Sequence, residues 1–113
     1  MKQTRIRSIS EKRKAQLIIY RGLEETLRRL CHNRSELSGN APDWQTEFLL
    51  TGHHIRGRNG QRLLDPFNIL LITADEHRAI HDECSPYTKE ELLRIVKELR
   101  IQQGFRLDKL TER

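Results

Sequence analysis

One short run of residues limits the folds open to this chain more than any other feature. Residues 68–72, Asn-Ile-Leu-Leu-Ile, contain four successive aliphatic side chains, and none of the 113 residues belong to a longer aliphatic run. The β-branched residues and the short length favour a buried strand over a helix. A run of this length is also far too short for a membrane-spanning helix, which needs about 20 apolar residues. A second strand is predicted over Phe48–Thr51, leading into Gly52–Ile55.

Three helices are predicted around these strands, each beginning at a capping box. In this pattern a Ser or Thr side chain and a Glu three residues later satisfy the first free N–H groups of the helix. The pattern occurs at Ser8–Glu11, at Thr73–Glu76 immediately after the apolar run, and at Thr88–Glu91. The middle helix is expected to stop near Cys84, and Gly104 is a plausible stop for the last helix.

Apolar residues recur at spacings of three and four in the first and last helices, as expected for amphipathic helices that cover a core. The core-facing residues predicted in the first helix are Ala15, Ile19, Leu23, Leu27 and Leu30. Those predicted in the last helix are Leu92, Ile95, Val96 and Leu99.

The order of elements is therefore helix, strand, loop, strand, helix, helix, which predicts an α+β fold with a two-stranded antiparallel element at its centre. The length suits a single domain over residues 1–113. Within it we expect a basic N-terminal helix over residues 8–34, a ββα unit over residues 46–83 and a C-terminal helix over residues 87–104.

The positive charge of the chain is concentrated at one end. Residues 1–34 contain ten Lys or Arg and three Glu, whereas the remaining residues carry a small net negative charge. Such an excess is typical of a surface that contacts phosphate backbones, although a solvated basic helix would look the same. The first residues lack the apolar segment of a secretory signal, and two cysteines cannot form a disulfide framework, so a reducing, cytoplasmic location is expected.

Two pairs of histidines flank the apolar strand. His53 and His54 end the first predicted strand, and His77 and His81 lie four residues apart, on one face of the middle helix. Each pair alone is weak evidence for a metal site. Neighbours on a strand point to opposite faces, so His53 and His54 can enter one site only if the backbone bends. A hairpin followed by a helix packed across it could nevertheless bring both pairs together around one divalent ion.

With Gly52–Arg58, Leu64–Leu70 and Glu76–His81, the chain resembles the HNH, or ββα-metal, endonucleases. It is most similar to the small phage and bacterial zinc-ribbon members of that family, which also begin with a basic helix. The motif covers about a quarter of the chain. The resemblance implies a central ββα-metal unit and metal-dependent hydrolysis of DNA phosphodiesters.

The resemblance also implies a role for each site residue. His53, His77 and His81 correspond to the metal ligands, and His81 alternatively contacts the scissile phosphate. His54 corresponds to the general base that deprotonates the attacking water, with open space beside it. Asn68 corresponds to the Asn that fixes the loop and so aims that base.

Arginines near these motifs are candidates for contacts with DNA phosphates, since the guanidinium group can form two parallel hydrogen bonds to a phosphate. Arg56, Arg58 and Arg62 follow the first histidine pair. Arg78 lies between the helix histidines and is expected to face solvent. A solvated loop is the alternative explanation for these residues.

The chain departs from the zinc-ribbon members at their cysteine pairs. Cys31 is followed by Arg34 where a second cysteine would stand, and Thr73 and Glu76 occupy the positions of the second pair. The structural zinc is therefore expected to be absent, and the missing stability is expected to come from helix packing or dimerisation. Cys31 and Cys84 are then expected to be small buried residues.

Three functions remain open at this point. The first is a DNA endonuclease, nicking or cutting both strands, as a monomer or a homodimer. Its single divalent ion would be manganese or magnesium in catalysis, with zinc or nickel also able to occupy the site. The second is a non-catalytic DNA-binding module with an HNH-like fold and a structural metal. The third is an interaction protein whose basic helix binds an acidic partner, and no membrane partner is expected.

Overall fold

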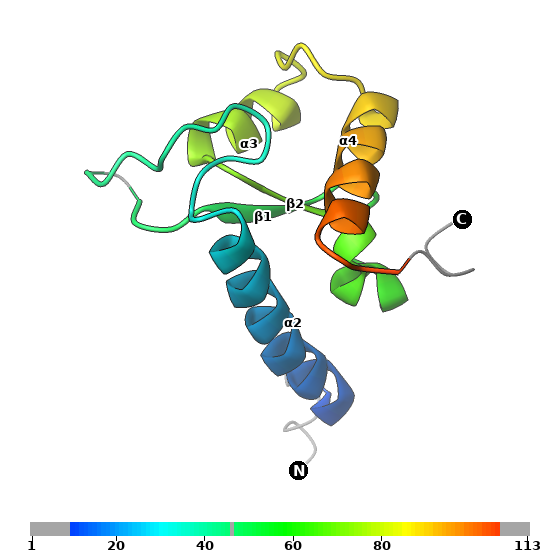
Figure 1. Ribbon diagram of the computed structural model, residues 1–113. Coiled ribbons are helices and arrows are strands. Elements are labelled where there is room, and N and C mark those ends of the chain that lie inside the picture. Colours follow the sequence, from blue (N-terminus) through cyan, green and yellow to red (C-terminus); the bar gives the residue numbers. More distant parts are fainter. Residues whose placement is uncertain (1–9, 46, 107–113) are drawn as a thin grey trace.

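The computed structural model describes residues 10–45 and 47–106 (Figure 1). It confirms a small α+β fold with a two-stranded antiparallel sheet. The elements in order are α2 (Glu11–Leu30), β1 (Thr51–His54), β2 (Ile69–Ile72), α3 (Ala74–His81) and α4 (Lys89–Gln102). Two short 3-10 turns, Gly60–Leu64 and Pro66–Asn68, connect the strands. No helix in the described part of the chain combines the length and the apolar character needed to cross a membrane.

The apolar strand β2 lies between two small hydrophobic cores, which explains why all four of its residues are buried. Ile69 and Leu71 pack into a core with Tyr20 and Leu27 of α2. Leu70 and Ile72 pack on the other face, into a core that α4 supplies with Leu92 and Val96. Alternate side chains of a strand point to opposite faces, so a continuous apolar run is what a strand covered on both faces requires.

The pairing of the two strands decides which face each histidine of the first pair occupies. His53 is opposite Leu70, and His54 is opposite Ile69. Residues directly opposite each other in an antiparallel pair have their side chains on the same face. His53 therefore shares a face with the α4 core, and His54 faces α2. Figure 1 shows α3 and α2 on opposite sides of the sheet.

The free edge of β2 is closed by a buried ion pair rather than by a third strand. The guanidinium group of Arg100 donates to both carboxylate oxygens of Glu36 at 2.7 Å, and also to the carbonyl oxygens of Ile69 and Pro66. Glu36 in turn donates its backbone N–H to the carbonyl of Leu71 and accepts the N–H of Leu71 at Oε1. An unpaired strand edge is unfavourable when it is buried, so this clamp holds α4 and the segment after α2 against the sheet.

Two of the three predicted capping boxes are confirmed. Thr73 caps α3 and Thr88 caps α4, in each case with the reciprocal Glu contact. At α2 the cap is Ser10, whose hydroxyl accepts the N–H of Arg13. Ser8 of the first predicted box lies outside the described residues.

Three other predictions are wrong in detail. The first strand begins at Thr51, and Phe48 is exposed rather than paired. The polar loop after the first histidine pair contains the 3-10 turn Gly60–Leu64. Cys84 is exposed and Cys31 only half-buried, so neither is a buried core residue.

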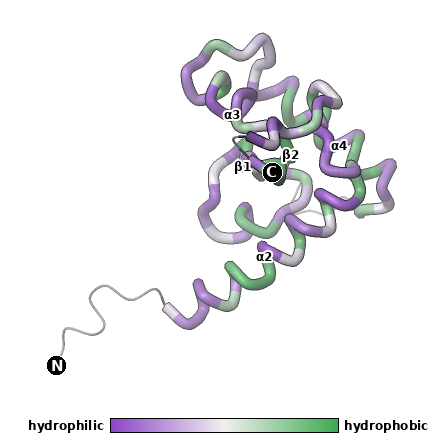
Figure 2. The backbone as a smooth tube through the Cα atoms, turned by 90° about the vertical axis from the view of Figure 1, so that its left-hand side faces the viewer, coloured by the Kyte–Doolittle hydropathy of each residue, from purple (hydrophilic) through white to green (hydrophobic). Residues whose placement is uncertain are grey.

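The predicted core face of α2 is also displaced. Ile19 and Leu30 are exposed, whereas Tyr20 is buried and Leu17 is half-buried against the core. Leu27 belongs to both patterns and is fully buried. The first half of α2 projects from the rest of the molecule and begins with a hydrophilic stretch (Figure 2). Because this half of the helix packs against other elements on one side only, the core covers the stripe that contains Tyr20 and leaves the stripe that contains Ile19 exposed.

Candidate metal centre

Three of the four clustered histidines converge, as the sequence predicted. His53 comes from β1, and His77 and His81 come from consecutive turns of α3. The ring centroids are 5.1 Å apart for His53 and His77, 4.7 Å for His77 and His81, and 6.1 Å for His53 and His81. One ring nitrogen of each lies within 4.8 Å of those of the other two.

Local structure explains how α3 presents its two imidazoles. The helix begins directly after β2, at the capping box of Thr73 and Glu76. The same Glu76 carboxylate accepts the hydroxyl of Ser35, which ties the start of α3 to the segment after α2. The i, i+4 spacing then places His77 and His81 on one face, toward His53 on β1.

The geometry and the donor set both fit a metal ion. Zinc–nitrogen bonds are about 2 Å long, so two ligands of one ion lie at most about 4 Å apart. Small rotations of the side chains would close the remaining difference. Three imidazoles suit a divalent transition metal and leave coordination positions for oxygen ligands. The cluster of His53, His77 and His81 could therefore hold a divalent metal ion.

Burial favours the neutral, metal-binding form of two of these imidazoles, His53 and His77. His53 is 9% exposed, and burial lowers its pKa to about 4, with further lowering by His77 and His81. The pKa of His77 is also lowered, first by burial and then by His81. A proton on any of these rings would compete with the ion for the same nitrogen.

His54 lies on the other face of β1, beside α2. Its ring centroid is 5.1 Å from that of Tyr20, and its Nε2 is 3.2 Å from the carbonyl oxygen of Leu63. A carbonyl oxygen only accepts hydrogen bonds, so Nε2 carries the proton and Nδ1 is left with a free lone pair. Burial lowers the pKa of His54, although the bond to Leu63 opposes this. His54 is half-buried, and the ring of Tyr20 occupies one side of the space beside it.

Asn68 holds the loop after His54 through its side chain. It is 1% exposed, accepts the N–H of Arg56 at 2.7 Å, and donates to the carbonyls of Gly57 and Arg62 at 2.9 and 3.0 Å. One amide thus bridges three backbone groups across the loop. This arrangement keeps the turn closed without regular secondary structure.

The four candidate arginines occupy different environments. Arg58 lies over the ring of Tyr20, with its guanidinium carbon 5.7 Å from the centroid. Arg62 donates to the backbone carbonyl of Arg56. The residue Arg56 is half-buried. Arg78 is exposed, as predicted, and pairs with Asp75 at 3.2 Å. Of the three loop arginines, Arg58 lies on the side of His54, where its charge adds to burial in lowering the pKa of that ring, whereas Arg78 lies on α3.

Sequence reasoning missed the tyrosine next to His54. The Tyr20 hydroxyl donates to Glu24 at 3.1 Å, and Glu24 pairs with Arg28 at 3.4 Å. Tyr20, Glu24 and Leu27 share one face of α2, so an alternative helical stripe through Tyr20 was the signal available. The adjacent Ile19 defines a second, equally apolar stripe, and that stripe was predicted to be the core face.

We expect Gly52→Ala to destabilise the protein by roughly 1–3 kcal/mol, because it overpacks the space between β1 and α2. A Cβ at Gly52 would lie 2.6 Å from the Tyr20 hydroxyl and 3.3 Å from Cγ2 of Ile69. Urea unfolding measures the loss. In the Tyr20→Phe background, which lacks the hydroxyl, the cost of Gly52→Ala should be much smaller. Gly22→Ala is the control, because its Cβ would meet no atom within 4 Å in α2. An equal cost in both Tyr20 backgrounds would contradict this explanation.

We also expect the stability of the metal-free protein to fall as the pH is lowered from about 6.5 toward 4. The unfolded chain binds a proton at His53 near pH 6.5, whereas the folded protein does so only near pH 4. The contribution of His53 to the unfolding free energy is thus fully present above about pH 6.5. It decreases as the pH falls toward 4, by on the order of 3 kcal/mol in all. Urea unfolding with a chelator at pH 7, 6 and 5 tests this, before carboxylates titrate. If the unfolding free energy of His53→Asn depended on pH as steeply as that of the unchanged protein, His53 would not be the group responsible.

Comparisons with protein families, with curated proteins and with solved structures find no match for this chain.

Proposed function

We propose that this chain is a metal-dependent DNA endonuclease of the HNH type. The observation that carries the proposal is the meeting of His53, His77 and His81, at ring nitrogens within 4.8 Å of one another, with His54 directly after His53 on β1 and on the opposite face of the strand. A structural metal site needs only the first three residues. The fourth histidine, held in one tautomer by Leu63, is the additional feature that favours catalysis.

His54 is the general base of the proposed reaction. With its proton on Nε2, it has an accepting lone pair on Nδ1 for the proton of the attacking water. When that proton arrives, the ring becomes an imidazolium that the Leu63 carbonyl stabilises. A base whose pKa is not raised above neutrality is unprotonated at physiological pH and ready to act.

His53, His77 and His81 are the proposed ligands of one divalent ion, with manganese or magnesium favoured in catalysis. When bound, the ion would supply positive charge for the phosphate oxygens and for the departing 3′-oxygen. Asn68 acts at a distance. Its amide donates to the carbonyl of Arg62 and so holds the turn whose next residue, Leu63, binds the ring of His54 through its carbonyl. By the family resemblance the products carry 5′-phosphate and 3′-hydroxyl ends.

Basic side chains on the α2 side support DNA as the substrate. Lys12, Lys14 and Arg21 are exposed on α2, and Arg58 and Arg62 are exposed on the loop after β1. Lysine and arginine at this density attract a polyanion through release of its counterions, which makes binding strongly dependent on salt. Arg56, from the same loop, and Arg78 on α3 are further candidates for phosphate contacts.

Incubation of the purified protein with supercoiled plasmid and a panel of magnesium, manganese, nickel and zinc tests the proposal. We expect conversion to open-circular or linear DNA with at least one of these ions, none with a chelator, and ends that DNA ligase can rejoin. Salt-sensitive binding without cleavage by any ion would instead identify a non-catalytic DNA-binding module. Absence of both binding and cleavage would favour an interaction protein with an acidic partner.

A further inference from the structure

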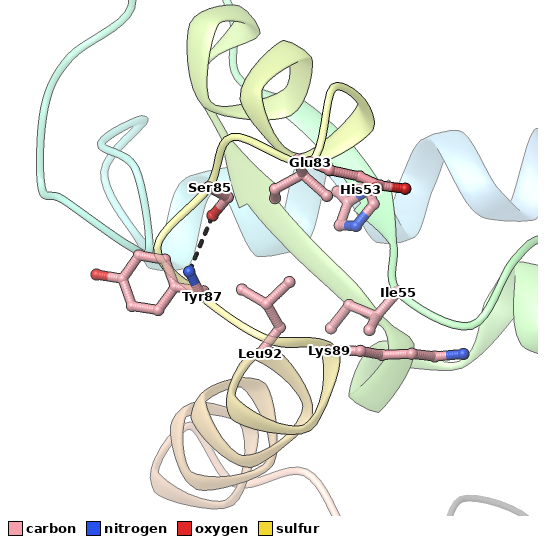
Figure 3. A pocket seen from close by; sticks show the side chains of 8 residues that line it. His53, Ile55, Glu83, Ser85, Tyr87, Lys89 and Leu92 are labelled. Carbon is pink, nitrogen blue, oxygen red and sulfur yellow. Dashed lines mark hydrogen bonds between the residues drawn. The ribbon is translucent and has the colours of Figure 1, made fainter.

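A pocket of about 360 Å³ opens next to the candidate metal centre, and His53 belongs to both. The pocket lies between the end of α3 and the start of α4. Figure 3 shows the His53 ring at one end, with the side chains of Glu83 and Lys89 extending on the same side as that ring. A ligand in this pocket would therefore contact His53, the same residue that would bind the metal ion.

The lining of the pocket is divided into an apolar floor and a polar rim. Ile55, Ile80 and Leu92 supply the floor, and Glu83, Ser85 and Lys89 supply polar groups around it. The side chain of Ser85 is held in place at the edge of the pocket, because its hydroxyl accepts the N–H of Tyr87 at 3.1 Å (Figure 3). Sites of this volume with an apolar lining and a few polar groups are typical of small-molecule ligands. A phosphate or a hydrated ion alone would gain nothing from an aliphatic floor.

We infer that this pocket binds one unpaired nucleobase of the DNA, next to the phosphate that is cut. The inference rests on the proposed function, which places a phosphodiester at the histidine cluster. In a nucleic acid the base is joined to its phosphate through a single sugar, so the first large group beside a phosphate at His53 is a base. Its flat faces suit the aliphatic side chains, and its polar edge suits Glu83, Ser85 and Lys89.

The inference names the class of substrate. A base inside a duplex is stacked and paired, and it must leave the helix before it can enter a pocket in a protein. That cost is smallest for a base that is already unpaired. The protein should therefore prefer single-stranded DNA, or duplexes with a bulged or mismatched nucleotide, over a perfectly paired duplex.

A binding experiment tests the pocket without depending on cleavage. The zinc-loaded protein is titrated with each deoxynucleoside 5′-monophosphate and, in parallel, with deoxyribose 5-phosphate, which lacks the base. We expect the base to increase affinity by about tenfold or more for at least one nucleotide. Ser85→Phe should abolish this gain by filling the pocket. The matched control is Pro86→Phe, which adds the same ring at a residue that lines only the neighbouring pocket, whereas Ser85 lines both.

A cleavage experiment tests the substrate class. Three duplexes of one sequence are compared: fully paired, with one bulged nucleotide, and with an abasic residue at the bulge. We expect cleavage next to the bulge to be about tenfold or more faster than in the paired duplex, and the abasic residue and Ser85→Phe each to remove the preference. Equal rates on the bulged and abasic duplexes, or equal affinity for nucleotides and deoxyribose 5-phosphate, would overturn the inference. If no DNA is cleaved at all, the proposed function fails, and the nucleotide titration still decides whether the pocket binds a base.

Discussion

His54→Ala should reduce the rate of DNA cleavage by about 10²- to 10⁴-fold, the range over which positioned general bases contribute. The variant loses the only group of the proposed site that accepts the proton of the attacking water. It keeps His53 on the other face of β1 and His77 and His81 on α3, so metal affinity should stay close to that of the unchanged protein. Single-turnover cleavage of a labelled duplex, with zinc titration in parallel, measures both quantities.

Two other histidine variants make this result specific. His53→Ala removes a metal ligand and should lower metal affinity and cleavage together. His32→Asn removes an exposed imidazole far from the site, at a positive φ of 56° that Asn tolerates well, and should change neither. If His54→Ala cut DNA at nearly the rate of His32→Asn, another group would have to be the base. If it instead lost the metal, His54 would be a ligand.

The second large effect is expected in stability, from Arg100→Met. This substitution removes five hydrogen bonds of a side chain with no exposed surface and leaves the carboxylate of Glu36 buried without its cation. Breaking one partner of a buried ion pair typically costs about 3–5 kcal/mol. A domain of this size has a total stability on the order of 5–15 kcal/mol. We therefore expect the thermal midpoint to fall by more than about 10 °C, or the protein to lose its folded state.

A double-mutant cycle separates the ion pair from simple loss of packing. Glu36→Gln alone should also be destabilising, because it leaves the buried guanidinium without a charge partner. The double variant with Arg100→Met should cost clearly less than the two single variants added together. Arg94→Met, on an exposed position of the same helix, is the control and should change stability little. Additive costs would show that Glu36 and Arg100 stabilise the fold independently.

The Glu36–Arg100 pair holds the segment after α2 against the sheet. The two residues lie 64 positions apart in the chain, yet they close the same edge of β2. Charged residues are common on helix surfaces, so their pattern in the sequence carried no sign of this contact.

Features decided by neighbouring residues could be predicted well. Capping at Thr73 and Thr88 involves groups only three residues apart, and the common face of His77 and His81 follows from one helical turn. The buried strand over Ile69–Ile72 followed from four successive apolar residues. The convergence of His53 with the helix histidines was also predictable, because an antiparallel strand pair that leads directly into a helix leaves few alternative arrangements.

Features that depend on distant partners could not be predicted in this way. Ile19 and Tyr20 are both apolar enough to face a core, and only packing against Gly52 and Leu63 selects Tyr20 and so places a ring beside His54. The pocket beside His53 likewise exists only because α4 packs near the end of α3. Hydrogen bonds and side-chain spacing within one turn act over a few residues, and the sequence displays them directly. The choice among equally apolar faces, and the pairing of charges across the fold, is made by the free energy of the whole packed chain.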